Sequence, residues 1–238
     1  MEMNALLTTT IGDDPLWKYT LPTMRAACRR HGWAFERITT CTVNETRFKN
    51  AVLNICFEKF RVADYLDRYD RVVMLDADTL VSPRCPDIFA EVPEEAIGGV
   101  FEDVGDCRDD RLEQIRKIRV MSNDLRLDGW SEGYLNAGVM VFSKYHREAL
   151  TLDFSDRPTW LVSDRTTYPD QNTMNYLCWR SGFAVCGLGF QWNHTEVFSD
   201  ADWHESHIKH YAGVDVEDRC AMAKADSEEW FSGREQWT

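Results

Sequence analysis

The feature that most constrains the fold of this chain is a run of apolar residues, Val72-Val73-Met74-Leu75, that ends in two carboxylates, Asp76 and Asp78. Apolar residues without polar alternation are typical of a buried strand in a parallel sheet. If the strand continues through the carboxylates, its period of two residues puts both on one face at its carboxyl end. Open α/β sheets bind their ligands at that edge, so the run predicts a binding site as well as a strand.

Converging carboxylates at such an edge repel each other unless a cation lies between them. Oxygen ligands favour Mg²⁺ or Mn²⁺, and these ions commonly bind substrate phosphates as well as protein. One interpretation of Asp76 and Asp78 is therefore a divalent-metal site for a phosphorylated substrate. The other is a strand that ends in a polar turn, because Asp is common in turns. These residues alone leave both interpretations open.

The segments around this strand alternate between strand and helix patterns. Leu53, Cys56, Phe57 and Phe60, for example, form an i, i+3, i+4, i+7 apolar stripe that is typical of a helix. Strands are expected at residues 4–10, 33–38, 71–75, 96–101 and 134–142, and helices at residues 16–31, at residues 53–63 and from Pro169 onward. Residues 107–128 are expected to be a charged, irregular segment that covers the site, with some helical periodicity at Leu112 and Ile115. The order β-α-β-α-β favours a parallel, doubly wound sheet with right-handed crossovers.

The composition narrows the partners and the cellular compartment. The 238 residues carry a net charge of −13, which argues against a nucleic acid or an anionic membrane as the main partner. The eight cysteines include no C-x-x-C pair, which argues against a zinc ribbon and favours a reducing compartment. The sequence shows no signal peptide and no apolar run of membrane-spanning length, so we expect a cytoplasmic protein without an integral membrane segment.

Glycine-rich phosphate loops are absent from the sequence. No G-x-G-x-x-G follows the first expected strand, and no G-x-x-x-x-G-K-[ST] occurs anywhere in the chain. If a nucleotide binds, a metal ion held by Asp76 and Asp78 is the available substitute for such a loop.

Further polar residues are candidates for the same site. Asp170 lies in the first turn of an expected helix, where the helix dipole favours the ionised form. It would be a poor general acid and a good acceptor for sugar hydroxyls, although such a residue can equally be ordinary helix charge. His204, His207 and His210 do not fit one zinc ion, because neither helix nor strand spacing makes all three converge. One histidine beside Gly213 could still complete an oxygen-rich site.

Motifs along the chain occur in the order found in a known enzyme family. The motifs are FEKF at residues 57–60, YDRVVMLDADTLV at 69–81, DIF at 87–89, LNAGVMV at 135–141, DQN at 170–172 with Asn175, WN at 192–193, and HYAG at 210–213. This ordered set, which spans Lys59 to Gly213, resembles the retaining glycosyltransferases of family 8, the glycogenin and bacterial galactosyltransferase group.

The resemblance implies a fold and an activity. It implies a single α/β domain of the GT-A (Rossmann-like) type at residues 1–213, with a mixed, mostly parallel central sheet flanked by helices. Residues 214–238 would be an acidic, aromatic-containing tail docked on this domain. The implied reaction moves a hexose or deoxyhexose from a nucleotide-diphosphate sugar, expected to be UDP-linked, to a hydroxyl of a glycan or other acceptor. Mn²⁺ or Mg²⁺ would assist, and the anomeric configuration would be retained.

The resemblance also assigns roles to matched residues. The implied metal ligands are Asp76, Asp78 and His210, and the implied catalytic residues are Gln171, near the anomeric carbon, and Asp170. The implied donor-binding residues are Thr8, Thr9, Thr10, Lys59, Asp76, Ala77, Asp78, Asn136 and Gly213. Lys59 would approach the phosphate or sugar, Asn136 and Asp170 would bind sugar hydroxyls, and the three threonines would lie against the uridine. Trp17 could stack on a ligand, although a buried aromatic is the simpler interpretation.

The sequence departs from the family pattern at two positions. The lysine of the family's K-P-W motif, which contacts the diphosphate, is missing after Gly213. Either Lys209 or Lys224 would replace it, or the metal alone would offset more of the charge. The acidic residue that the family carries three positions before its D-Q pair is Thr167 here. Gln171 is a poor nucleophile, so a front-face path, in which the diphosphate helps to deprotonate the acceptor, fits better than a double displacement.

Three alternatives stay open at this level. An inverting glycosyltransferase and a non-catalytic nucleotide-sugar-binding module would carry similar motifs. A haloacid dehalogenase phosphatase also uses a D-x-D pair, but its hydroxyl residue stands four positions after the first aspartate and the pair lies on the first strand. Thr79 stands three positions after Asp76, and two strands are expected before it, so this alternative fits less well.

Overall fold

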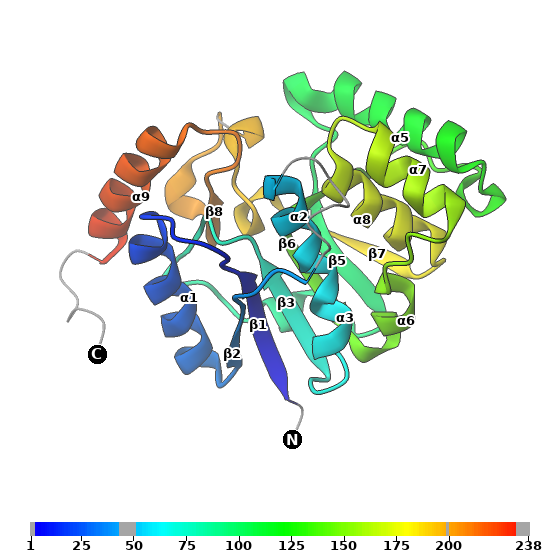
Figure 1. The fold of residues 1–238 in the computed structure, drawn as a ribbon. Helices are drawn as coiled ribbons and strands as arrows, with labels where there is room; N and C mark the ends of the chain where they lie inside the picture. Colours follow the sequence, from blue (N-terminus) through cyan, green and yellow to red (C-terminus); the bar gives the residue numbers. More distant parts are fainter. Residues whose placement is uncertain (1–2, 43–50, 199, 232–238) are drawn as a thin grey trace.

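The computed structural model describes residues 3–42, 51–198 and 200–231, which are built around a six-stranded sheet of order β2-β1-β3-β6-β5-β7 (Figure 1). Its strands are β1 (Asn4–Thr9), β2 (Ala34–Ile38), β3 (Arg71–Leu75), β5 (Ala96–Phe101), β6 (Leu135–Ser143) and β7 (Ala184–Leu188). β1 is parallel to β2 and β3, β6 is antiparallel to β3 and β5, and β7 is parallel to β5. The predicted α/β fold with a mixed, mostly parallel sheet is confirmed.

Helices flank this sheet on both faces, and a short second sheet lies beside it (Figure 1). The helices are α1 (Trp17–His31), α2 (Ala51–Phe57), α3 (Val62–Tyr65), α4 (Ile88–Glu91), α5 (Arg108–Ser122), α6 (Arg147–Leu150), α7 (Arg157–Arg165), α8 (Pro169–Arg180) and α9 (Val216–Phe231). The second sheet pairs β4 (Thr79–Val81) with β8 (Ile208–His210) in antiparallel register. α1 ends as expected at Gly32, whose φ of 73° is the left-handed conformation that glycine adopts without strain.

The central strand β3 is buried on both faces, which explains its lack of polar alternation. Val72 and Met74 join the apolar cluster around Phe60, whereas Val73 and Leu75 join the cluster on the opposite face of the sheet. All five residues of β3 are buried. A strand covered by helices on both sides gains hydrophobic stabilisation from each of its side chains, so an unbroken apolar run is favoured there.

The strand does not continue through the two aspartates, so the assumption of strand geometry at residues 76–78 is wrong. β3 ends at Leu75, and the chain turns before β4 begins at Thr79. The turn is closed at Asp76, whose carbonyl oxygen accepts hydrogen bonds from the Thr79 backbone N–H at 3.1 Å and hydroxyl at 2.9 Å. The polar-turn interpretation is therefore confirmed, and the same turn brings the two carboxylates together.

The expectation of an irregular segment at residues 107–128 is also wrong, because α5 occupies most of it. The inward-facing side chains Arg111, Gln114, Ile115, Ile118 and Ser122 are buried and follow helical spacing. Three of these five are polar, so the hydrophobic pattern alone did not reveal the helix. The polar positions are buried because they form the hydrogen-bond network described below.

The expected helix at residues 53–63 is present but interrupted. α2 gives way to a 3-10 turn, Glu58–Arg61, before α3 begins at Val62. Glu58 and Lys59 are buried within this turn. A 3-10 turn inside a helical segment commonly marks a functional position. Here it directs a lysine towards the carboxyl ends of the strands.

The C-terminal helix α9 lies beside α1 (Figure 1). Ala223 of α9 shares an apolar cluster with Leu16, Leu80 and Tyr211, and the half-buried Trp230 packs against the same cluster. The proposed division of the chain at Gly213 stays a prediction, and residues 232–238 lie outside the described part. Among the helices that the structure describes, none combines the length and the apolar character needed to cross a membrane.

Candidate active site and metal centre

Asp76, Asp78 and His210 form a compact group of potential metal ligands at the carboxyl edge of β3. One ligand atom from each residue lies within 4.8 Å of the other two. His210 Nε2 is 3.3 Å from Asp78 Oδ1 and 4.0 Å from Asp76 Oδ2. Two carboxylates and one imidazole are a donor set that suits Mn²⁺ and Mg²⁺. The residues present therefore fit a divalent cation.

Pairing of the short strands β4 and β8 brings His210 to the two aspartates. Thr79, directly after the turn, is the register partner of His210. The backbone N–H of Tyr211 donates to the carbonyl oxygen of Asp78 at 3.1 Å, which fixes the turn against β8. His204, in contrast, is exposed and contacts Asp202 and Glu229 on the surface. The prediction that the three histidines do not converge agrees with this arrangement.

Asn193 determines which nitrogen of His210 faces the aspartates. Its Oδ1 lies 2.9 Å from His210 Nδ1, and its Nδ2 donates to Asn136 Oδ1 at 2.8 Å. Because the carboxamide nitrogen is already used, the oxygen must accept, so His210 carries its proton on Nδ1. This tautomer leaves the lone pair of Nε2 directed at Asp76 and Asp78. Such outer hydrogen bonds commonly orient metal-binding histidines.

Gly138 of β6 allows the imidazole of His210 to approach the sheet. A Cβ atom at this position would lie 2.2 Å from His210 Cε1 and 2.6 Å from Nδ1. The carbonyl oxygen of Gly138 accepts the backbone N–H of Asp76 at 2.8 Å. Glycine is therefore required here by the close approach of the ring, and the same residue anchors the turn of the first aspartate.

The charged side chains around Asp76, Asp78 and His210 shift one another's pKa values. Burial alone would lower the pKa of His210, but the charge and hydrogen bond of Asp78 and the charge of Asp76 raise it. Burial would raise the pKa of Asp78, but His210 outweighs burial and lowers it. Burial raises the pKa of Asp76 in spite of the opposing charge of Lys59. In the imidazolium form of His210 the second proton lies on Nε2, and a divalent cation bound to Nε2 would take its place.

Lys59 lies between the metal ligands and the helix α8. Its Nζ is 3.2 Å from Asp76 Oδ1 and 3.1 Å from Asp170 Oδ2. Burial alone would lower the pKa of Lys59, but these two carboxylates raise it, so the lysine is a fixed cation. The ion pairs link Asp170, at the N-terminus of α8, to the D-x-D turn. The expected contacts of Lys59 and Asp170 with a donor stay predictions.

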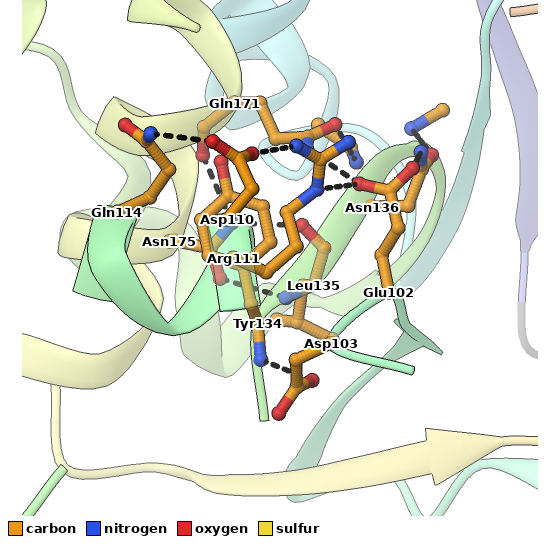
Figure 2. Close-up of polar contacts among 12 residues, drawn as sticks. Glu102, Asp103, Asp110, Arg111, Gln114, Tyr134, Leu135, Asn136, Gln171 and Asn175 are labelled. Atoms are coloured by element: carbon orange, nitrogen blue, oxygen red, sulfur yellow. Dashed lines mark hydrogen bonds and ion pairs between the residues drawn. The ribbon is translucent and has the colours of Figure 1, made fainter. Parts of the chain in front are cut away.

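A cavity of about 610 Å³ lies next to this corner, and Asn136 and Gln171 face it. Figure 2 shows that their side chains meet at Glu102, which follows β5. Glu102 Oε1 accepts from Asn136 Nδ2 at 3.0 Å, and Oε2 accepts from Gln171 Nε2 at 2.9 Å and from Arg111 Nε at 2.8 Å. The other end of the Gln171 amide accepts the backbone N–H of Ala137 at 3.1 Å. Both ends of this carboxamide are thus fixed.

The wider network that supports the cavity is made by buried polar side chains (Figure 2). Asp103 accepts the backbone N–H groups of Gly133 and Tyr134 at 2.8 and 2.9 Å. Asn175 of α8 bonds both the N–H and the carbonyl oxygen of Leu135, each at 2.8 Å. These bonds tie β5 and α8 to the start of β6, where Asn136 is located, and so they hold the cavity wall rigid.

Residues 19–215 match the sequence profile described as Glycosyl transferase family 8. The chain belongs to this family. The resemblance seen in the motifs is thereby confirmed, and family membership makes the protein a glycosyltransferase. No curated protein sequence matches the chain.

Solved glycosyltransferase structures share the fold of this family 8 protein. One is a glycosyltransferase involved in glycosylation of the major capsid of PBCV-1, with a TM-score of 0.60, 13% identity, and coverage of 94% of this chain and 99% of that one. The galactosyltransferase LgtC, in complex with donor and acceptor sugar analogs, has a TM-score of 0.60 and 17% identity, with coverage of 94% and 96%. Mouse xyloside xylosyltransferase 1 has a TM-score of 0.53 and 15% identity, with coverage of 89% and 98%.

The two lysines expected to replace the family's missing cation do not face the metal ligands. Lys209 Nζ is 2.6 Å from Asp226 Oδ2 of α9, and this ion pair is largely buried. Lys224 lies on the exposed face of α9, 3.8 Å from Glu228. In this structure both lysines pair with carboxylates of the C-terminal helix, and which of the two alternatives replaces the missing lysine stays a prediction.

Arg219 of α9 is the cation that approaches the metal ligands instead. Its Nη1 is 3.7 Å from Asp78 Oδ2, and its Nη2 is 2.8 Å from Asp14 Oδ2. Its Nε is buried and has no hydrogen-bond partner in the described structure. No local sequence signal marks Arg219, because its place beside Asp78 depends on the packing of α9.

The remaining predicted residues differ in their burial and in their contacts. Thr8 is buried with its hydroxyl unpartnered, and Thr10 accepts a hydrogen bond from Arg37 Nε at 2.8 Å. The Ala77 carbonyl oxygen accepts the hydroxyl proton of Thr20 at 2.7 Å, and Gly213 lines the cavity. Trp17 is half-buried on α1, where it lines a separate surface hollow, so it is neither a core aromatic nor part of the cavity.

Sequence analysis missed Glu102, Arg111 and the role of Asn193. Glu102 directly follows an expected strand, and the argument used for Asp76 applies to it equally: polar residues after buried strands gather at the ligand-binding edge. Arg111 had no usable signal, because it lies in a helix that the pattern did not predict. Asn193 belonged to a matched motif, but its partner His210 is distant in sequence.

Proposed function

We propose that this family 8 protein transfers a hexose or deoxyhexose from a nucleotide-diphosphate sugar, UDP-linked, to an acceptor hydroxyl with retention of configuration and with the help of Mn²⁺ or Mg²⁺. The observation that carries the proposal is the group Asp76, Asp78 and His210, with Nε2 of His210 directed at the carboxylates by Asn193. A bound divalent ion supplies a Lewis acid that offsets the negative charge of the departing diphosphate.

The chain's own residues supply the remaining functions. Asn136 presents polar atoms for sugar hydroxyls in the cavity, and Asp170, which forms an ion pair with Lys59, presents its carboxylate next to the metal ligands. Arg219 adds a guanidinium at the outer side of Asp78, where it would attract the diphosphate. Preorganised charges of this kind are usually the largest single contribution to catalysis.

The hydrogen bonds of Gln171 and Glu102 favour a front-face path over a double displacement. The Gln171 carboxamide is neutral, and both of its ends are bonded. Glu102 is a carboxylate in the same cavity, but both of its oxygens accept N–H bonds, including one from Arg111. Gln171 carries no charge and both oxygens of Glu102 are engaged in hydrogen bonds, so neither group is well suited to attack the anomeric carbon. In the front-face path the acceptor oxygen forms the new bond while its proton passes to the leaving diphosphate.

Separate D76N and D78N variants test the metal-dependent reaction. Each removes one anionic ligand, so we expect hydrolysis and transfer of UDP-sugars with Mn²⁺ to fall by at least about 100-fold. Mass spectrometry of a panel of UDP- and GDP-sugars, with and without a chelator, measures the loss. D64N is the matched control, because Asp64 is exposed and lies away from the site. Undiminished metal-dependent turnover in both site variants would refute the proposal.

The stereochemistry and the role of Arg219 need their own measurements. NMR of the product's anomeric proton at early times reports retention, and an inverted product would exclude the front-face path. R219M should raise the KM for the donor by roughly tenfold, the size of one lost charge contact. R219K, which keeps the charge, should show a smaller rise in the donor KM. K224M should leave the donor KM unchanged because Lys224 faces solvent.

A further inference from the structure

The outer part of the cavity is acidic. It is built from two 3-10 turns, η2 (Gly105–Cys107) and η6 (Glu196–Phe198), which lie against each other. A Cβ on Gly105 would be 3.8 Å from the Val197 carbonyl oxygen, so the turns are in close contact. Asp106 and Glu196 line the cavity from these turns, and Asp200 lines it from the segment that follows. All three are exposed at its mouth.

These three carboxylates are not neutralised by the protein. Among the described residues that line the cavity, Arg111 is the only lysine or arginine. Arg111 already pairs with Glu102 and Asp110, so it contributes no free positive charge to the mouth. Within the described chain, Asp106, Glu196 and Asp200 take part in no ion pair. A concave surface that carries charges of one sign concentrates opposite charge and repels like charge.

A buried hydroxyl beside the same mouth points to a polar ligand. Thr195 precedes η6 and lines the cavity, with only 5% of its surface exposed. Its Oγ1 has no hydrogen-bond partner in the described structure. Buried polar atoms are normally satisfied, so an unpartnered hydroxyl at a cavity wall is a place where a ligand atom binds. Thr195 therefore supplies an observation that is independent of the acidic residues.

The cavity faces away from the proposed diphosphate end. Neither the two aspartates nor His210 lines it, and it reaches that end only through Ala212, Gly213 and Asn136. In the proposed reaction this cavity would hold the transferred sugar, near Asn136 and Gln171, and the acceptor beyond it. The acidic mouth at Asp106, Glu196 and Asp200 belongs to the acceptor side.

We propose that this mouth selects the acceptor by charge: it binds a hydroxyl acceptor that bears an ammonium group, such as an amino sugar, and rejects acceptors that bear a carboxylate or a phosphate. The proposal rests on the proposed glycosyl transfer. The ammonium group contacts the carboxylates of Asp106, Glu196 and Asp200, and a ring hydroxyl bonds Thr195 Oγ1. The acceptor hydroxyl that reacts then faces Gln171 at the inner end of the cavity.

The first test reports the electrostatic potential at the mouth of the cavity and does not require glycosyl transfer. Cys107 lines the cavity within η2, so its thiolate can displace iodide from neutral iodoacetamide or from anionic iodoacetate. The ratio of the two rates, followed by mass spectrometry of the Cys107 peptide, cancels any effect of the thiolate population. In the triple variant D106N/E196Q/D200N, iodoacetate should gain roughly threefold to tenfold relative to iodoacetamide. The control D64N/E148Q/E228Q makes the same change of net charge at exposed positions outside the cavity and should leave the ratio unchanged.

The second test compares acceptors that differ in charge. With a hydrolysable UDP-sugar and Mn²⁺, glucosamine should be used better than glucose, and glucose better than glucuronic acid, by roughly tenfold at each step in kcat/KM at low salt. In the triple variant the differences in kcat/KM among the three sugars should become smaller, and T195V should lower transfer to all three sugars. The amino alcohol 2-amino-1,3-propanediol tests whether a sugar ring is needed, and we expect it to be a poorer acceptor than glucosamine.

The outcomes separate this proposal from the proposed function. Absence of metal-dependent donor hydrolysis in the unmodified protein would overturn the proposed function, whereas the Cys107 ratio can still be measured. An unchanged Cys107 ratio in the triple variant, or equal use of glucuronic acid and glucosamine by an active enzyme, would overturn the selection by charge.

Discussion

The carboxamide oxygen of Asn193 lies 2.9 Å from Nδ1 of His210, and this contact connects the cavity lined by Asn136 and Gln171 to the candidate metal ligands. Asn193 in turn donates to Asn136, and Asn136 donates to Glu102. A continuous chain of buried hydrogen bonds therefore runs from the cavity wall to Nδ1 of His210. The arrangement explains why residues that touch no metal are expected to affect metal binding.

Replacement of Asn193 by alanine should weaken Mn²⁺ binding by roughly 10- to 100-fold. The variant removes the acceptor that holds the Nδ1–H tautomer of His210, so Nε2 is no longer fixed towards the aspartates. Titration calorimetry with Mn²⁺ alone measures the effect without substrate. H204A is the control, because His204 is exposed and contacts only surface carboxylates. Equal Mn²⁺ affinity of N193A and the unmodified protein would show that the ring is held by packing instead.

Replacement of Gly138 by alanine should displace the imidazole of His210. The new methyl group would lie 2.2 Å from Cε1, far inside contact distance, so the ring must move and Mn²⁺ affinity should fall by at least roughly tenfold. G98A is a matched control on β5, where the methyl group would meet a Val92 side-chain atom at 2.5 Å. Both variants should lose about 1–3 kcal/mol of unfolding free energy, but only G138A should lose metal affinity. A similar loss of affinity in G98A would attribute the effect to general destabilisation.

The E102Q variant should lose both stability and transfer. Glu102 accepts from Arg111, Asn136 and Gln171, and a glutamine offers one oxygen fewer and points an amide nitrogen at these donors. Arg111 keeps its second partner, Asp110, so the loss of the charged hydrogen bond to Glu102 should cost about 1.5–3 kcal/mol of unfolding free energy in chemical denaturation.

A double variant separates the two effects of Glu102. E102Q/R111M removes both buried charges and should regain much of the lost stability, while donor hydrolysis stays low because Gln171 is no longer fixed. The exposed pair Glu113 and Arg116 provides the control, E113Q/R116M, with little change in either property. Recovery of full activity in E102Q/R111M would show that Glu102 acts only through Arg111.

Stability should fall as the pH drops from 7 to 5, in part through His146. Burial lowers the pKa of His146, whose Nδ1 accepts the backbone N–H of Ser143 at 3.0 Å. The unfolded chain then binds the proton more readily than the folded one, so stability is full above the ordinary pKa and is lost on acidification. Protonation of Nδ1 breaks the bond to Ser143, so H146N should reduce the loss between pH 7 and 5 by about 1 kcal/mol.

The exposed His204 should contribute to the pH dependence of stability with the opposite sign, so it provides the control. The hydrogen bonds that His204 donates to the carboxylates of Glu229 and Asp202 raise its pKa, so its contribution is present at low pH and is lost as the pH rises. H204Q should therefore make the loss on acidification larger. The same pH dependence in H146N as in the unmodified protein, by urea denaturation at both pH values, would contradict the assignment to His146.

The fold could be predicted in outline because its main elements carry local signals. The apolar run of β3 reported burial on both faces, and the glycine at the end of α1 reported a helix terminus. The helix α5 was not predicted because its buried face includes Arg111 and Gln114. These two side chains form hydrogen bonds with other polar side chains and do not pack as hydrophobes. Local sequence patterns indicate which apolar residues are buried, but they do not show which partners a buried polar residue has.

The sequence by itself determined the sheet, the family and the position of Asp76 and Asp78 at its carboxyl edge, because periodicity and motif order are properties of short segments. Only the tertiary structure decided how these aspartates acquire their partners. The pairing of β4 with β8 sets His210 opposite Thr79, and a turn, not a continued strand, directs the carboxylates. The packing of α9 likewise sets Arg219 beside Asp78. Such contacts join residues that are far apart in the chain, and their geometry depends on strand register and helix packing.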